Sequence, residues 1–342
     1  MKPRIAITLG ASFLGYAANA GFLARLHELG VRPVRVGGSS AGAIAAGLYA
    51  AGLPADKIRE VVLSWGLRLS FVSGTPWFMH YVRNTFCSSY PAVFKPDAAV
   101  NYLESILGDR KIEDLHEPTF MAAVCDLDAA RTHFMQSGSL ARTMVASCCV
   151  PTIFSPLKFV GMNCFDGGVV HEAPFDPWLE DDEIDTIIMH RVAHTEQSYP
   201  RFLPFNLFKI TAQAHACASE QLLQYRLRLA AILGKKVLIT QTTHDRPALF
   251  SGNRMPDFYE AGVQQAQRFF DQELKAIMEA SVQLPQPPPC LAWACKGSSN
   301  QGISDRAPLR VCSANTYTSR ASIQDAHESL FQSDPKRAAS GL

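Results

Sequence analysis

One serine in this chain has the surroundings of a catalytic nucleophile. Ser40 is the centre of Gly38-Ser39-Ser40-Ala41-Gly42, a G-x-S-x-G pentad. The strand-like run 34–36 precedes it and the small-residue, helix-like run 43–51 follows it, which is the context of a nucleophile elbow. Such a tight turn needs glycine or another small residue at its flanks. It presents the serine hydroxyl at the amino end of a helix, where the dipole and free N–H groups stabilise an oxyanion.

A simpler interpretation of the pentad stays open. Gly, Ser and Ala are common residues, and the same five residues suit an ordinary strand-to-helix loop in which Ser40 caps the helix. Further residues must decide between the two interpretations.

A serine hydroxyl needs a base to remove its proton. His171, His190 and His194 lie in the second half of the chain, where the histidine of a Ser-His-Asp hydrolase could fall, but none has a distinctive local setting. Asp166 is the better candidate. Gly167 and Gly168 follow it, so the backbone can turn sharply there and approach another loop closely. A plain Asp-Gly turn is the alternative.

The elements that must position these residues alternate between strand and helix. This alternation predicts an α/β fold with a mostly parallel central sheet flanked by helices in three layers. Residues 132–135 are expected to form a hairpin with the strand before them. The expected strands are 4–9, 34–36, 120–125, 132–135, 157–160, 184–190 and 236–240, and the expected helices 16–29, 43–52, 140–149, 212–233 and 256–282.

The composition changes twice along the chain. Residues 57–107 are dense in aromatic side chains without clean periodicity, which indicates an irregular insertion over the core, a lid or an acyl-pocket wall. From residue 284 a Pro-rich run opens a tail rich in Ser, Ala and Gln. We therefore expect one domain over 1–283 and a poorly ordered tail over 284–342.

Charge and apolar patterning exclude several classes of protein. The 342 residues carry a net charge of +1, so nothing indicates a nucleic-acid partner. No window is apolar for the roughly 18 residues of a membrane span, and the amino-terminal apolar run is too short for a signal sequence. Nine cysteines without regular spacing, with Cys148 and Cys149 adjacent in an apolar segment, indicate reduced thiols in a cytoplasmic protein and no metal site.

Three blocks in order resemble the patatin-like phospholipases, lipid acyl hydrolases with a Ser-Asp dyad. The resemblance covers about residues 4–280. The first block runs from Leu9 to Gly15 and on through 21–30, the second is 37–43, and the third runs from Ala146-Ser147 and Pro151 to Asp166-Gly167-Gly168 and Pro174. The resemblance implies that Ser40 is the nucleophile and Asp166 the general base, with no histidine and no cofactor.

The resemblance also places an oxyanion hole, formed by backbone N–H groups of Gly10, Ala11, Ser12 and Ala41. The chain departs from the family here, because Ala11 and Ser12 stand where glycines are usual and Leu14 stands where a basic residue is usual. Alanine and serine keep their N–H groups but tolerate a positive φ poorly, so this departure bears on the geometry of the hole.

The expected function is a serine lipid acyl hydrolase acting on phospholipid or acylglycerol esters through an acyl-Ser40 intermediate. A transacylase with the same dyad, a histidine-dependent hydrolase and a non-catalytic lipid-binding protein on this fold are the alternatives. Trp77, Phe78 and the run 202–208 are apolar enough to touch a membrane or lipid droplet, and equally suited to a core.

Overall fold

The computed structural model describes residues 3–72, 90, 92–195, 203–245 and 254–280. The chain divides into two units, 1–285 and 286–342, and all described residues belong to the first. The expected tail over 284–342 therefore lies outside the described residues, as do Trp77 and Phe78.

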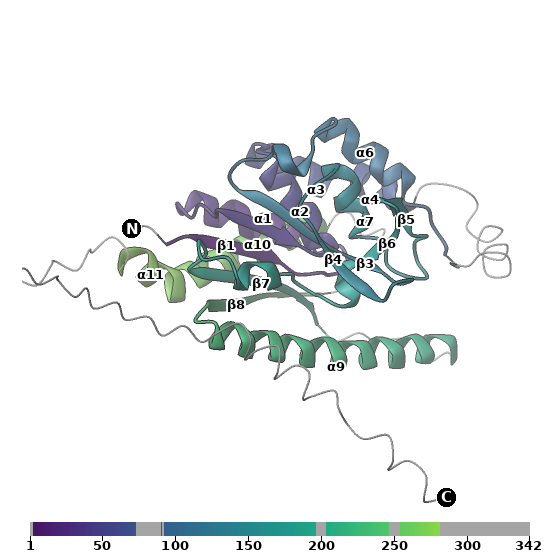
Figure 1. Ribbon diagram of the computed structural model, residues 1–342. Helices are drawn as coiled ribbons and strands as arrows, with labels where there is room; N and C mark the ends of the chain where they lie inside the picture. Colours follow the sequence, from purple (N-terminus) through teal and green to yellow (C-terminus); the bar gives the residue numbers. More distant parts are fainter. Residues whose placement is uncertain (1–2, 73–89, 91, 196–202, 246–253, 281–342) are drawn as a thin grey trace, which may run out of the picture. The chain divides into compact units, whose positions relative to one another are not determined.

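The described residues build an eight-stranded sheet in the order β5-β6-β3-β2-β1-β7-β8, with β4 paired to β3 (Figure 1). From β3 to β8 the neighbours run parallel, whereas β4, β5 and β6 are antiparallel to their partners. This confirms the predicted α/β fold, including the hairpin partner of β3. The strands are β1 (Ile5–Leu9), β2 (Arg35–Gly38), β3 (Thr119–Asp126), β4 (Arg131–Met135), β5 (Leu157–Phe159), β6 (Met162–Asp166), β7 (Thr186–His194) and β8 (Lys236–His244).

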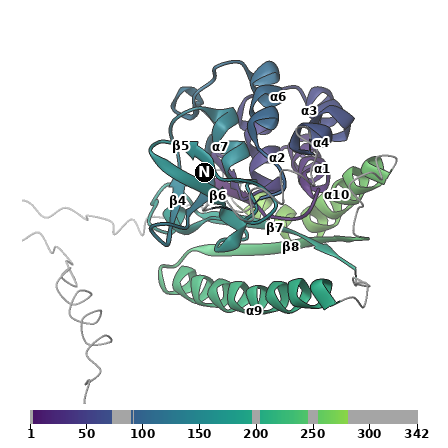
Figure 2. The ribbon, with the colours of Figure 1, turned by 90° about the vertical axis from the view of Figure 1, so that its right-hand side faces the viewer.

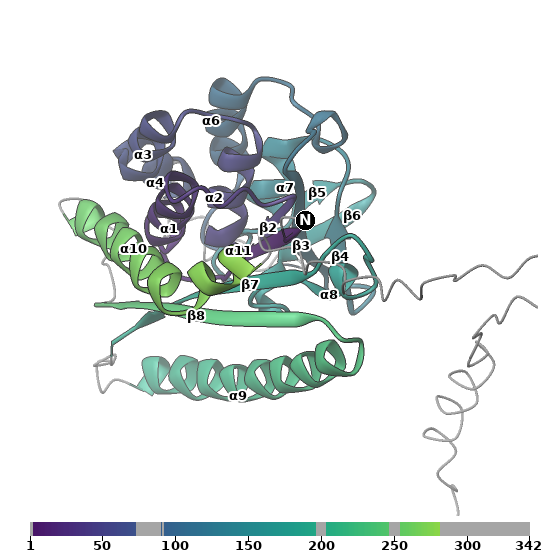
Figure 3. The ribbon, with the colours of Figure 1, turned by 90° about the vertical axis from the view of Figure 1, so that its left-hand side faces the viewer.

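Helices cover both faces of the sheet. Side chains alternate between the faces of a strand, and so Ile5 and Ile7 join one buried cluster while Ala6 joins the other. The larger cluster lies under α1, α2, α6, α7 and α10, and the smaller one under α8 and α9. Figure 2 and Figure 3 show α9 on the opposite side of β8 from α10. The helices are α1 (Tyr16–Glu28), α2 (Ala41–Ala50), α3 (Ala55–Leu63), α4 (Trp65–Val72), α6 (Asp97–Leu107), α7 (Leu140–Ala146), α8 (Asp176–Leu179), α9 (Leu203–Ile232), α10 (Met255–Phe269) and α11 (Lys275–Ala280).

Two stretches are more helical than their sequence suggests. Helix α9 begins at Leu203 rather than near 212, and Pro204 lies in its first turn, where the missing N–H costs no hydrogen bond. Within the aromatic-rich insertion, α3, α4 and α6 are regular helices. None of the helices in the described ranges combines the length and the apolar character needed to cross a bilayer.

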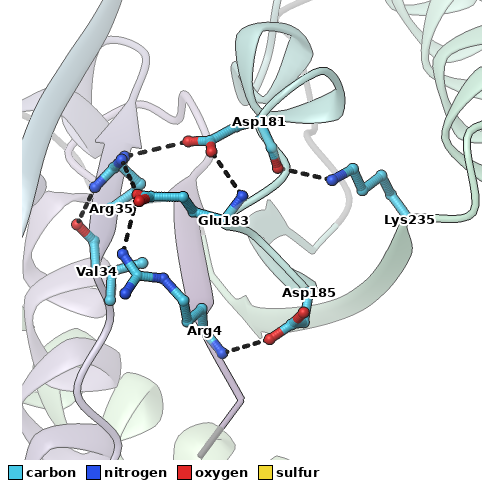
Figure 4. A network of polar contacts seen from close by, with 7 residues as sticks. All are labelled: Arg4, Val34, Arg35, Asp181, Glu183, Asp185 and Lys235. Carbon is cyan, nitrogen blue, oxygen red and sulfur yellow. Dashed lines mark hydrogen bonds and ion pairs between the residues drawn. The ribbon is translucent and has the colours of Figure 1, made fainter.

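Charged side chains tie the strands together at their amino ends, away from Ser40 (Figure 4). Arg35 pairs with Asp181 at 3.4 Å and with Glu183 at 3.0 Å, and Arg4 pairs with Glu183 at 3.0 Å. The network joins the start of β1 and β2 to the loop before β7. Glu183 is exposed and Arg4 is partly exposed, so the two ion pairs of Glu183 contribute little stability.

Candidate active site

Ser40 occupies a strained turn between β2 and α2. Its φ of 53° and ψ of −122° lie outside the regions that an L-residue ordinarily adopts. A Cβ on Gly42 would lie 2.1 Å from the Leu9 carbonyl oxygen, and one on Gly38 would lie 2.4 Å from the Gly42 carbonyl carbon. Both glycines of the pentad are therefore required by close backbone approach, as a nucleophile elbow demands.

Asp166 is the last residue of β6 and begins a second tight turn. Its carboxylate accepts a hydrogen bond from the N–H of Gly168 at 2.7 Å, and the residue is only 4% exposed. A Cβ on Gly167 would lie 2.2 Å from the Ala123 carbonyl oxygen, and one on Gly168 would lie 2.7 Å from the Cβ of Ala11. The two glycines thus let this turn press against β3 on one side and the Gly10–Gly15 loop on the other.

The sheet register brings the two turns together. Val124 of β3 pairs with both β4 and β6, so these two strands lie on opposite edges of β3. Ala122 of β3 pairs with both β2 and β4, so β2 also lies on the edge opposite β4. Strands β2 and β6 therefore share one edge of β3 and run toward each other. Gly38 pairs with Ala122 and Asp166 with Val124, positions about 7 Å apart along the strand. Ser40 follows Gly38 into this gap.

A short segment after α7 holds both turns. The Ser147 hydroxyl accepts a hydrogen bond from the Ser40 N–H at 2.9 Å and donates one to the Ala123 carbonyl at 2.7 Å. Two residues later, the Cys149 carbonyl accepts a hydrogen bond from the Asp166 N–H at 2.9 Å. The segment 147–149 therefore fixes the backbone of Ser40 and that of Asp166 in one frame.

Between these two anchors, the Cys148 thiol lies close to both side chains. Burial raises the pKa of this thiol well above its usual value, the charge of Asp166 raises it further, and a hydrogen bond with Ser40 lowers it. A thiol in this environment stays protonated and does not compete as a nucleophile. Cys148 and Cys149 are both buried and free, as the sequence predicts.

The Gly10–Gly15 loop lies beside the Asp166 turn, and two of its backbone N–H groups already donate to protein carbonyls. The Gly10 N–H donates to the His190 carbonyl and the Ala11 N–H to the Glu172 carbonyl, each at 2.8 Å. Within the described ranges, the N–H groups of Ser12 and Ala41 have no acceptor. Neither Ala11 nor Ser12 has a positive φ; the left-handed residue of this loop is Leu14, at φ 53°.

The three candidate histidines contact residues other than Ser40. His190 is buried between Asn19 and Thr242, with 2.8 Å to each, and it stacks on Phe22. Burial lowers its pKa to about 3, so the ring is neutral and holds a structural position. His171 lies 3.4 Å from the Asp176 carboxylate. The His194 ring contacts the Ser12 hydroxyl at 2.9 Å.

Sequence reasoning missed three residues that organise the site. Asn19 donates to the Gly10 carbonyl at 3.1 Å while its amide oxygen meets the His190 ring, and so it supports the Gly10–Gly15 loop from within the core. Ser147 and Cys148 stood in the third block without an assigned task. Their position in the same block as Pro151 and Asp166 was the sequence signal that could have identified them.

Taken together, the fold and this site define a three-layer α/β protein with a serine on a nucleophile elbow beside a buried aspartate. The family model described as patatin-like phospholipase matches residues 9–179, a range that includes Ser40 and Asp166. The chain belongs to the patatin-like phospholipase family.

Similar proteins align with part of the chain. An uncharacterised NTE family protein of Mycobacterium tuberculosis is 27% identical over 178 residues, which are 52% of this chain and 46% of that protein. The human patatin-like phospholipase domain-containing protein 6 is 27% identical over 176 residues, which are 50% of this chain and 12% of that protein. The matched region is thus less than half the length of these relatives.

Two solved structures share a distant likeness. VipD from Legionella pneumophila superposes with a TM-score of 0.42 at 14% identity, covering 79% of this chain and 67% of that one. ExoU from Pseudomonas aeruginosa, solved with SpcU, gives a TM-score of 0.38 at 13% identity, covering 81% and 53%.

Proposed function

We propose that this protein is a serine lipid acyl hydrolase that cleaves carboxylic esters through an acyl-Ser40 intermediate, with Asp166 as the general base. The observation that carries the proposal is the shared frame of the two residues. The segment 147–149 anchors the backbone of each, and the Cys148 thiol lies near both side chains. Membership of the patatin-like phospholipase family supports the same assignment.

In the proposed acylation step, the Ser40 oxygen attacks the ester carbonyl carbon and the Asp166 carboxylate takes the hydroxyl proton. The tetrahedral intermediate then collapses, the ester C–O bond breaks, and Asp166 returns the proton to the departing alcohol or lysolipid. A water molecule repeats the sequence on the acyl-enzyme and releases the fatty acid. Direct proton transfer requires the serine and carboxylate oxygens to approach within about 3 Å during the reaction.

The negative charge of the intermediate needs donors aimed at the carbonyl oxygen. The N–H groups of Gly10 and Ala11 already donate to protein carbonyls. We therefore assign the stabilisation of the oxyanion to the N–H groups of Ser12 and Ala41. Ala41 is the first residue of α2, so the helix dipole adds to its donor. One such donor typically contributes about a hundredfold or more in rate.

The substrates that fit this proposal are phospholipid or acylglycerol esters. Phe71 packs edge-on and Phe94 packs tilted against Phe154, which follows the segment 147–149 by five residues. Apolar surface of this kind suits an acyl chain.

A fluorophosphonate probe and a short-chain nitrophenyl ester test the assignment. Wild type should react covalently at Ser40 and hydrolyse the ester, whereas Ser40→Ala and Asp166→Asn should each lose most of the activity, by about a thousandfold or more. Tandem mass spectrometry of the labelled peptide identifies the modified serine.

Ser39→Ala is the matched control, because Ser39 is the adjacent serine and its hydroxyl donates to the His171 carbonyl at 2.6 Å. Its labelled peptide should still carry the probe on Ser40. Undiminished hydrolysis in Asp166→Asn would refute the aspartate as base. An unlabelled Ser40 in folded wild type would favour the non-catalytic alternative.

A further inference from the structure

The paired strands β7 and β8 continue beyond the end of β1. The last residue of β1, Leu9, pairs with His190, whereas β7 runs on to His194, which pairs with His244 at the end of β8. Strand β7 thus extends past its last pairing with β1. The loop that follows β1 begins at this point, where the Gly10 N–H donates to the His190 carbonyl at 2.8 Å.

Alternate side chains of this part of β7 contact the loop and the helix after it. Side chains at every second position share one face of a strand, so those of His190, Val192 and His194 point to the same side. The His190 ring stacks against α1. A Cβ on Gly15 would lie 3.3 Å from the Val192 Cγ1 atom, and the Ser12 hydroxyl lies 2.9 Å from His194 Nε2. One face of β7 therefore supports the loop both at its end and at Ser12.

Other aromatic rings hold the His194 ring in place. The His244 ring meets it edge-on with 4.9 Å between centroids, and it stacks on Phe258 of α10 at 4.1 Å. The Asp245 carbonyl oxygen lies 2.8 Å from His244 Nδ1. A carbonyl only accepts, so this nitrogen carries a hydrogen and donates it, which fixes the His244 ring. A ring packed in this way presents its Nε2 to Ser12 in one orientation.

Ser12 has two of its three polar groups bonded within the protein. Its hydroxyl is hydrogen-bonded to His194, and its carbonyl accepts the Gly15 N–H at 3.3 Å. The third group, the backbone N–H, has no acceptor within the described ranges and is the donor assigned above to the oxyanion. Because the side chain and the carbonyl are both held, the direction of this N–H is set before a substrate binds. Stabilisation of an oxyanion depends on such preorganised donors.

We propose that His194 is a positioning residue for the acylation step, because its ring holds the Ser12 hydroxyl and so aims the Ser12 N–H at the oxyanion. The inference rests on the proposed function, which supplies the reaction at Ser40. In this role His194 takes no proton from Ser40 and acts only through Ser12. An amide side chain can make the same hydrogen bond, whereas it cannot replace a general base.

Steady-state hydrolysis of the nitrophenyl ester by three His194 variants tests this role. His194→Phe keeps a ring without its nitrogens, and kcat should fall about tenfold to a hundredfold with KM within about twofold, because a misdirected oxyanion donor affects the transition state. His194→Gln places an amide nitrogen near the position of Nε2 and should keep kcat within about threefold of wild type. His194→Asn is too short to reach Ser12 and should behave like His194→Phe.

The change Ser12→Ala, alone and combined with His194→Phe, shows whether the histidine acts through Ser12. Ser12→Ala keeps the N–H and removes the hydroxyl, so kcat should fall by about the same factor as in His194→Phe. Both changes remove one hydrogen bond, so the double variant should lie within about twofold of the single ones. Thr195→Ala is the matched control from the adjacent position. Its hydroxyl donates to Asp245 at 2.7 Å, and its kcat should equal that of wild type.

Wild-type kcat in His194→Phe would overturn the inference, and so would losses that multiply in the double variant. A loss in His194→Gln as complete as in Ser40→Ala would overturn it in favour of a histidine base. If circular dichroism shows that His194→Phe does not fold, the contrast between His194→Gln and His194→Asn decides in the same way. A wild type that hydrolyses no ester would refute the proposed function and this inference with it, whereas hydrolysis unaffected by the His194 variants refutes the inference alone.

Discussion

The Ser147 hydroxyl holds the backbone of Ser40, accepting its N–H at 2.9 Å while donating to the Ala123 carbonyl at 2.7 Å. Ser40 has a φ of 53°, so its turn needs such a restraint to persist. Ser147 is fully buried, and both of its bonds reach strands or turns distant in sequence. The bridge also occupies the Ser40 N–H, so the next N–H, that of Ala41, is the one that we propose as an oxyanion donor.

Removing this bridge should impair the chemical step. In Ser147→Ala the Ser40 N–H and the Ala123 carbonyl lose a common partner, and the elbow can shift relative to Asp166. We expect kcat for a nitrophenyl ester to fall about a hundredfold with a smaller change in KM, because a displacement near 1 Å has that effect on a positioned group. Steady-state kinetics on variant protein of verified fold gives the answer.

Ser139→Ala supplies the control from the other end of the same helix. Ser139 caps α7, and its hydroxyl accepts the Arg142 N–H. Removal of this cap should reduce the free energy of unfolding by about 1 kcal/mol. It should leave kcat for the nitrophenyl ester near the wild-type value. Equal kinetics in the two variants would show that Ser147 has no positioning role.

The buried amide of Asn19 should matter for activity through the Gly10–Gly15 loop. Asn19→Ala removes the donor to the Gly10 carbonyl and the partner of the His190 ring. We expect the rate of fluorophosphonate labelling at Ser40 to fall roughly tenfold or more, because the loop loses its internal support. Thr242→Val disturbs only the far side of His190 and should slow labelling less. If Thr242→Val slowed labelling more than Asn19→Ala, the proposed support of the Gly10–Gly15 loop by Asn19 would be refuted.

The neutral His190 ring should make the protein less stable in mild acid. Burial lowers its folded pKa to about 3 from an ordinary 6.5. The unfolded chain therefore takes up this proton first, so the stability is fully present above pH 6.5 and decreases as the pH falls toward 3. Between roughly pH 7.5 and 5.5 this residue alone should remove about 1.4 kcal/mol.

Urea denaturation at those two pH values, for wild type and His190→Gln, measures this contribution. The variant is less stable throughout but should lose about 1.4 kcal/mol less between them. Identical losses would mean that another group accounts for the acid sensitivity.

Two arginines that form ion pairs should differ in their contribution to stability. Arg226 is 6% exposed and meets both carboxylate oxygens of Asp176, at 2.9 and 2.6 Å. Burial opposes ionisation of Asp176, but hydrogen bonds and charge from His171 and Arg226 prevail and hold its pKa well below the usual value. Arg226→Met should therefore destabilise by about 3–5 kcal/mol.

Arg35→Met is the matched change, since Arg35 pairs with Asp181 and with the exposed Glu183. It should cost about 1 kcal/mol or less. Thermal denaturation of both variants makes the comparison. A similar cost for both would contradict the role of burial assigned here.

Much of the architecture could be read from local pattern. The apolar run before Gly10 and the strand–pentad–helix order around Ser40 predict β1, β2 and α2 at nearly their observed bounds. Hydrophobic periodicity did not predict α4, because the helix lies in a stretch crowded with aromatic residues of weak helix propensity. Its helical form depends on packing Leu67 against the core. The start of α9 was missed because Pro204 resembles a break, although proline suits a first turn.

The sequence by itself determined which residues have the chemistry, since the G-x-S-x-G pentad and the Asp-Gly-Gly turn are local requirements of close backbone approach. Tertiary structure alone decided which groups meet. The shared edge of β3 and the Ser147 bridge join residues tens of positions apart. Strand register and burial fix those pairings, and neither is encoded in the spacing of the residues concerned.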